Sequence, residues 1–334
     1  MSFFQKALGT EKGINITNMG LMLLSTAVAF VIPFKLFLFV YAVLGPLHYL
    51  TEISWLDRKN YFIEKKWHVW PYILVALLLT VSLFNDRSSL RYYSTTLMVG
   101  IVVYTLAISI SKKYLLSILL GAATVILCLA LKIDRIFSFV LAFSVFLPTI
   151  VHVFLFTAVF VLYGALKTRS TSGFISFGIF VLCALSFAFI NPANTEILSV
   201  TEKGYISRYF LMLNESLANI FGIPETTSKG EFFTVPALIA VQRFIAFAYT
   251  YHYLNWFSKT TVIKWHEVSK TRMGVILFLW VLSVAAYYID YRLGFMVLFT
   301  LSMLHVFLEF PLNIISFKGV GQGFKNIFSK GNVA

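Results

Sequence analysis

The sequence predicts an all-α protein whose helices cross a lipid bilayer about ten times. Hydrophobic residues make up 59% of its 334 residues and charged residues only 12%, and its mean hydropathy is +0.84. Soluble domains carry about 25% charged residues, so a soluble fold of this length is a poor fit. Apolar runs recur along the chain, and most are long enough to cross a hydrocarbon core of roughly 30 Å as helices. We therefore expect one integral membrane domain over residues 1–334.

The apolar runs give the expected boundaries of the ten spans. In chain order these are 14–32, 36–56, 69–85, 92–111, 114–131, 136–166, 173–191, 233–257, 273–288 and 293–315. The connections between them are mostly short. The exception is 192–232, whose apolar piece from Ile206 to Phe221 could form an interfacial helix.

The charges of the loops predict how the chain is oriented. Ten spans put both termini on one side, and the loops of that side carry nearly twice as many Lys and Arg as the others. Basic loops stay in the cytoplasm, so we expect both termini there and the protein in the inner (cell) membrane. The same rule accounts for the net charge of +13, and we expect no nucleic-acid partner.

Ionisable side chains inside the spans indicate where a functional site lies. Two acids, Glu52 and Glu309, fall within spans, and each follows a histidine, His48 or His305, by four residues. One helical turn places such a pair on one face. A charged side chain at bilayer depth costs roughly 2.5–3.5 kcal/mol on insertion scales, so something should offset it. Arg243, the one base inside a span, could pair with a buried acid or reach the outer interface.

Four of the six histidines lie inside spans that all run from outside to inside in this topology: His48, His152, His252 and His305. At about 1.5 Å per residue, one site in the cytoplasmic half of the bilayer could collect all four. Imidazole binds iron, zinc and copper, and a histidine-rich set with an open position suits an Fe(II) ion that activates dioxygen. We therefore predict a metal site.

Two further pairs of residues bear on this site. Glu52 and Glu309 could bind the metal or hold the imidazole tautomers by hydrogen bonds. Tyr251 and Tyr253, on either side of His252, bring hydroxyl groups close to it. We take these four side chains as the candidate catalytic residues.

Prolines precede two of the histidines. Pro46 lies two residues before His48, and Pro148 lies four residues before His152. Proline removes a hydrogen bond from the helical ladder, so we expect a kink at each. Membrane helices tolerate this where the backbone is buried in protein or lines a cavity.

Two other interpretations of the same residues stay open. The histidines and acids could relay protons or bind the substrate of a transporter, although no inverted repeat is visible. A lone intramembrane histidine also often makes just one interhelical hydrogen bond. Fatty-acid desaturases are disfavoured because they need close histidine clusters, and no two histidines here lie within five residues.

The stretch Gly45-x-x-His48-x-x-x-Glu52 resembles the Gly-x-x-His-x-x-x-Asp motif of the Brp/Blh family of membrane β-carotene dioxygenases. His152, in Val151-His152-Val153-Phe154, looks like the mid-chain histidine of that family. His252, beside tyrosines, is similar to a later one, and His305 resembles the histidine of a C-terminal span. Glu52 stands where the family has aspartate, and the paired histidines expected on one helix are missing.

The resemblance implies a multi-span enzyme that cleaves a carotenoid with iron held by histidines. Together with the residues themselves, it predicts a membrane oxygenase whose Fe(II) ion is bound by four helices. Dioxygen and a long apolar molecule, such as a carotenoid, another isoprenoid or an acyl lipid, would be its reactants.

Overall fold

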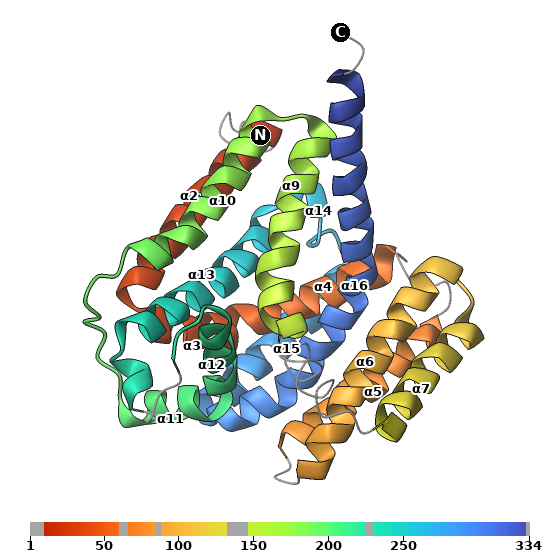
Figure 1. The fold of residues 1–334 in the computed structure, drawn as a ribbon, viewed down its shortest axis with the longest axis horizontal. Helices are drawn as coiled ribbons and strands as arrows, with labels where there is room; N and C mark the ends of the chain where they lie inside the picture. The colour runs from red at the N-terminus through yellow and green to blue at the C-terminus, as the bar shows by residue number, and fades with distance from the viewer. Residues whose placement is uncertain (1–9, 60–65, 85–87, 132–145, 225–229, 332–334) are drawn as a thin grey trace. The chain divides into compact units, whose positions relative to one another are not determined.

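The computed structural model describes residues 10–59, 66–84, 88–131, 146–224 and 230–331 (Figure 1). Every regular element within these ranges is a helix, which confirms the all-α class. The first ten residues of the predicted span 136–166 lie outside the described ranges. The apolar piece predicted within 192–232 is helical, because α11 (Val200–Tyr209) and α12 (Leu211–Ile220) cover it.

Six helical segments of the described chain are long and apolar enough to cross a membrane. They are Glu11–Val31, Pro33–Arg58, Leu147–Thr168, Thr171–Phe189, Lys270–Ile289 and Tyr291–Ile327. Shorter apolar helices lie in three other predicted spans, at Trp67–Ser82, Thr96–Ser111 and Tyr114–Ala130. The chain is thus compatible with a multi-pass membrane protein, while the number of ten spans and the orientation of the termini stay predictions.

The chain folds as two compact units. The first comprises Met1–His48, Thr149–Glu267 and Ser316–Ala334, and the second comprises Tyr49–Pro148 and Val268–Ile315. Elements of the first unit are α2 (Glu11–Val31), α3 (Pro33–Phe39), η1 (Val40–Leu44), η3 (Leu147–Phe156), α9 (Thr157–Thr168), α10 (Thr171–Phe189), α11, α12, η4 (Glu231–Phe233), α13 (Pro236–Ser258) and α14 (Thr260–Ile263). Elements of the second are η2 (Lys66–Val69), α5 (Trp70–Leu83), α6 (Ser88–Ser111), α7 (Tyr114–Leu131) and α15 (Lys270–Ile289). Two helices, α4 (Gly45–Lys59) and α16 (Tyr291–Gly331), continue from one unit into the other, and the first two residues of η3 belong to the second unit.

Helix α13 is the core of the first unit. It is buried along most of its length and packs against α2, α3, α10 and α12 (Figure 1). Its sequence explains why it is buried in protein, because lipid could not form hydrogen bonds with its polar side chains, Gln242, Arg243, His252 and Asn255. The predicted span 233–257 is therefore a helix, but one covered by protein and not among the six apolar segments.

Arg243 reaches the exposed loop that follows α10. Its guanidinium donates hydrogen bonds to Asn191 Oδ1 at 3.0 Å and to the Pro192 carbonyl at 2.9 Å, and it lies over the ring of Phe30. Its hydrogen-bond partners are thus neutral groups and not a buried acid. The side chain is 0% exposed, so Arg243 is bonded inside the protein to neutral oxygens, which neither expectation from the sequence foresaw.

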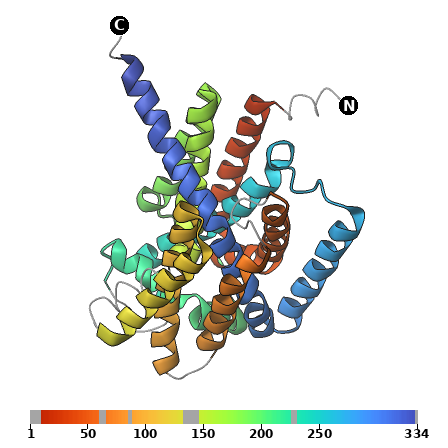
Figure 2. The same cartoon turned by 90° about the vertical axis from the view of Figure 1, so that its right-hand side faces the viewer.

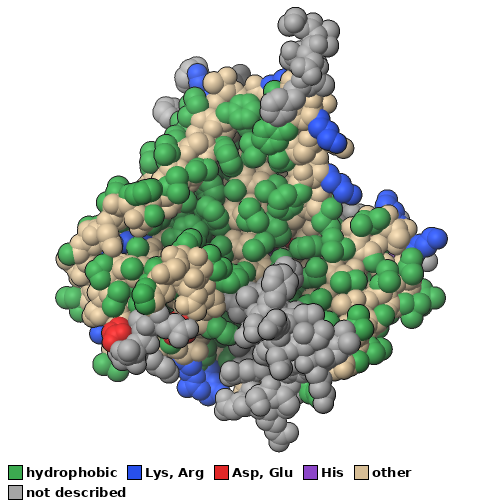
Figure 3. Space-filling model, in the orientation of Figure 1, with side chains coloured by type: hydrophobic (Ala, Val, Ile, Leu, Met, Phe, Trp, Pro, Cys, Tyr) green, Lys and Arg blue, Asp and Glu red, His purple; other side chains and the backbone are tan. Residues whose placement is uncertain are grey.

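Much of the described surface is apolar, as lipid contact requires. Large side chains of α15 such as Val275, Phe278 and Val281 are exposed. Figure 3 shows hydrophobic side chains over much of the face that it presents. Exposed apolar patches of this extent are rare on soluble monomers, which again favours a membrane environment.

In the second unit α6 and α7 lie side by side at very short range (Figure 2). A Cβ atom added at Gly121 would lie 2.9 Å from the Gly100 carbonyl oxygen and 3.2 Å from Tyr104 Cβ. Small residues allow this close backbone approach, which stabilises membrane helix pairs.

Replacing Gly121 by valine should destabilise this helix pair by about 1–3 kcal/mol, because no space exists for the side chain. Gly20→Val is the matched control, since a Cβ there meets nothing within 4 Å. Both variants would be unfolded in mixed detergent micelles by rising fractions of dodecyl sulfate. Equal stability of the two would contradict the close packing described here.

Candidate metal centre

Three buried histidines converge in the first unit. His48 is carried by α4, His152 by η3 and His252 by α13, and they are 1%, 1% and 7% exposed. The Nε2 atoms of His48 and His252 lie 3.0 Å apart. The ring centroid of His252 lies 4.7 Å from that of His48 and 4.7 Å from that of His152. Histidines far apart in the sequence therefore meet, as the metal hypothesis requires.

The expected disturbance by proline is present before two of these histidines. The N–H of Gly45 bonds to the carbonyl of Val40, five residues back, in the wide turn η1. Pro46, which follows, has no N–H to continue the ordinary ladder. After Pro148, Thr149 has φ −113° and ψ −107°, outside the helical region, so the helix kinks there. Wide turns of this kind occur often at functional sites.

The side chain of Thr157 contacts the His252 ring at the nitrogen that does not face His48. Its Oγ1 lies 2.9 Å from Nδ1 of His252, and both groups are buried. The two nitrogens of His252 thus have different neighbours, Thr157 on one side and His48 on the other. Oriented rings of this kind are typical of metal-binding histidines.

The two candidate tyrosines have different surroundings. The ring of Tyr253 lies 5.1 Å from that of His48 and 5.5 Å from that of His252, centroid to centroid. The hydroxyl of Tyr251 instead donates to Asn18 Oδ1 of α2 at 3.3 Å, and Oδ1 of Asn255 lies 3.4 Å away. Successive helical residues point about 100° apart, so only Tyr253 is placed beside these histidines by its described contacts.

The fourth histidine and both acids belong to the second unit. His305 stacks on Tyr49, with ring centroids 4.3 Å apart and planes at 29°. Glu52 and Glu309 are 1% and 4% exposed and lie close enough to interact electrostatically. The side-chain amide of Asn313 donates to Glu309 Oε2 at 3.4 Å. Within this unit, therefore, the two predicted carboxylates do come together.

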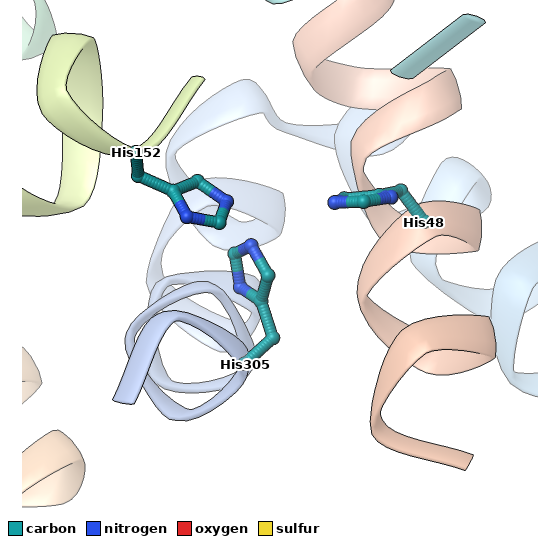
Figure 4. A group of neighbouring side chains, drawn as sticks. All are labelled: His48, His152 and His305. Carbon is teal, nitrogen blue, oxygen red and sulfur yellow. The ribbon is translucent and has the colours of Figure 1, made fainter. Parts of the chain in front are cut away.

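His48, His152 and His305 are a triad that could bind a metal ion through one ring nitrogen each (Figure 4). Nitrogen donors of this type suit iron, zinc or copper. The donor set alone does not choose among these metals.

Two residues near the histidines were not predicted from the sequence. Tyr49 could have been suspected because it directly follows His48. Thr157 gave no signal, because a threonine in an apolar helix ordinarily bonds to its own backbone. Only the three-dimensional structure brings its hydroxyl to His252.

Comparisons of this chain with models of protein families, with curated proteins and with solved structures find no match.

The two buried carboxyl groups should affect stability in a non-additive way. Replacing either Glu52 or Glu309 by glutamine changes the same interaction between the two side chains, so the effect of Glu52→Gln with Glu309→Gln should differ from the sum of the single changes. Coupling energies of about 0.5–3 kcal/mol are usual for neighbouring groups. The free energy of unfolding would be measured in detergent at neutral pH for the metal-free wild type, the two single variants and the double variant. Strictly additive effects would contradict the contact.

Proposed function

We propose that this protein is a membrane-embedded oxygenase that binds Fe(II) through His48, His152, His252 and His305. Its substrate would be a long apolar molecule taken from the bilayer. The observation that carries the proposal is the convergence of buried imidazoles within a chain of membrane-type helices. Buried ionisable groups in such a setting are rare and usually functional.

The spacing of two of these nitrogens suits a shared metal ion. Metal–imidazole bonds are about 2.0–2.1 Å long, so two such ligands at 90–110° lie about 2.9–3.4 Å apart. The Nε2 atoms of His48 and His252 are separated by 3.0 Å. This separation is compatible with a metal ion that binds both nitrogens.

The position of Tyr49 supports the inclusion of His305. This tyrosine follows His48 directly in α4, and its ring stacks on His305. The stacking holds the imidazole of α16 beside the helical turn that carries His48. One turn of α4 would thus position two of the four proposed ligands.

The proposed roles of the acids follow from charge. Four neutral imidazoles leave the +2 charge of Fe(II) unbalanced in apolar surroundings, which is costly. Glu52 and Glu309, one turn after two of the ligands, could balance this charge or orient the imidazoles. When bound, Fe(II) with an open position would supply the activation of dioxygen.

The surroundings of the histidines suit an apolar reactant. Tyr253 and Trp256 place aromatic rings 5.1 and 5.4 Å from that of His48. A membrane-dissolved substrate would meet such rings without the desolvation cost that polar walls carry. The carotenoid substrate suggested by the four sequence motifs is one member of this class.

The buried carboxyl pair also favours a second candidate, a proton-coupled transporter. Ionisable side chains inside helical bundles often mark proton pathways, and Glu52 interacts with Glu309 within one unit. A transporter would need these acids but no transition metal. Its flux in proteoliposomes would be abolished by Glu52→Gln and be insensitive to chelators.

The oxygenase proposal is tested by metal analysis of the purified protein. We expect about one transition-metal ion per chain in the wild type, and a loss of at least tenfold in metal content in His48→Ala and His305→Ala. His266→Ala is the matched control, because His266 is exposed and should keep full occupancy. Removal of the metal by chelation should lower the melting temperature, because an ion that binds only the folded state stabilises it.

The same preparation would then be incubated with β-carotene in detergent under labelled dioxygen. Label in the products would support an oxygenase, and its loss in the histidine variants would connect it to the site. Wild-type protein that holds no transition metal, together with unchanged function in His48→Ala, would reject the proposal.

A further inference from the structure

We propose that Thr157 is a positioning residue that keeps the proton of His252 on Nδ1, so that Nε2 of His252 is directed at the metal. The inference rests on the proposed metal site and adds a residue to it. Thr157 would touch neither the metal nor the substrate. It would act through the ring that it holds.

The contacts of the two ring nitrogens of His252 define the geometry. Nδ1 lies 2.9 Å from Oγ1 of Thr157, and Nε2 lies 3.0 Å from Nε2 of His48. Thr157 is 1% exposed, so water does not compete for this hydrogen bond. Each ring nitrogen therefore has a defined neighbour.

The chemistry of a neutral imidazole then permits two arrangements. It carries one proton, so one nitrogen donates and the other accepts. With the proton on Nδ1, the hydroxyl oxygen of Thr157 accepts and Nε2 keeps its lone pair for a metal. With the proton on Nε2, the hydroxyl must donate to Nδ1, and Nε2 has no lone pair to offer. Only the first arrangement is compatible with metal binding.

The same reasoning predicts which nitrogen of His48 carries its proton. If Nε2 of His252 is an acceptor, then Nε2–H of His48 donates across the 3.0 Å contact in the metal-free protein. A metal ion that replaces this hydrogen bond requires His48 to give up the Nε2 proton. Metal binding should therefore change the protonated nitrogen of His48 and leave that of His252 unchanged.

The wide turn η3 explains how two residues of one segment, His152 and Thr157, both contact His252. His152 and Thr157 are five residues apart, which in an ordinary α-helix places side chains about 140° apart. In a turn with hydrogen bonds from residue i to i+5, such residues lie one above the other. His152 lies within this turn, and Thr157 follows it at the start of α9. Both reach His252, the first through its ring and the second through its hydroxyl.

The first test removes the hydroxyl without changing the shape of the side chain. Thr157→Val should weaken binding of Co²⁺, used as a visible probe, by about 10–100-fold, and Thr157→Ser should restore it. The ligand-field absorption of bound Co²⁺ should also shift in the valine variant, because the ring is no longer held. Thr26→Val is the matched control, since it removes another buried hydroxyl of the first unit that bonds to the Met22 carbonyl.

A second measurement reads the protonated nitrogen directly in the wild-type protein. Proton-detected NMR of the wild type labelled with ¹⁵N-histidine, assigned with His252→Gln, should show His252 protonated at Nδ1 with and without Zn²⁺. A proton on Nε2 of His252 in the Zn²⁺-bound protein would overturn the inference. So would Co²⁺ binding and spectra of Thr157→Val that equal those of the wild type. Wild-type protein that binds neither ion would overturn the metal site itself together with this inference.

Discussion

The cost of placing ionisable groups among apolar ones governs this structure. A chain this hydrophobic can bury a polar side chain only against protein, because lipid offers no hydrogen bonds. Helix α13 illustrates the constraint, since its polar residues are enclosed by α2, α3, α10 and α12. The four candidate histidine ligands follow the same rule. Each is buried in protein and has other polar or aromatic side chains beside it.

Departures from regular helix geometry position the site. The wide turn η1 and the kink at Thr149 both stand beside prolines, and both lie within a few residues of a histidine. An unbroken helix would rotate each side chain by a fixed 100° from the one before it. The wide turns change that rotation locally. They allow His152 and Thr157 to approach one ring from the same segment, which regular spacing would not allow.

The sequence predicted the helical class and most helix positions because hydrophobic runs and prolines are local signals. It also predicted the burial of the four candidate histidine ligands and of Glu52 and Glu309, because an ionisable residue in an apolar run avoids lipid by packing against protein. It could not separate Tyr251 from Tyr253, since neighbouring residues on a helix differ only in direction, and direction depends on packing. The contact of Thr157 with His252 joins residues 95 positions apart. No periodicity carries that information, and the wide turn that permits it is itself a tertiary feature.

Charge balance connects the histidines to the two acids. Imidazoles bind a divalent ion without neutralising it, and an unbalanced +2 charge in apolar surroundings is costly. Two carboxyl groups held together without a cation are costly as well. Glu52 and Glu309 lie one turn after His48 and His305. In the proposed site, a bound cation would favour the ionised form of these carboxyl groups, and the carboxylates would balance the charge of the cation. Arg243 is buried as well, and its guanidinium donates to the neutral oxygens of Asn191 and Pro192. In the proposed metal site, a cation would account for the burial of Glu52 and Glu309, and its need for ligands would account for the histidines.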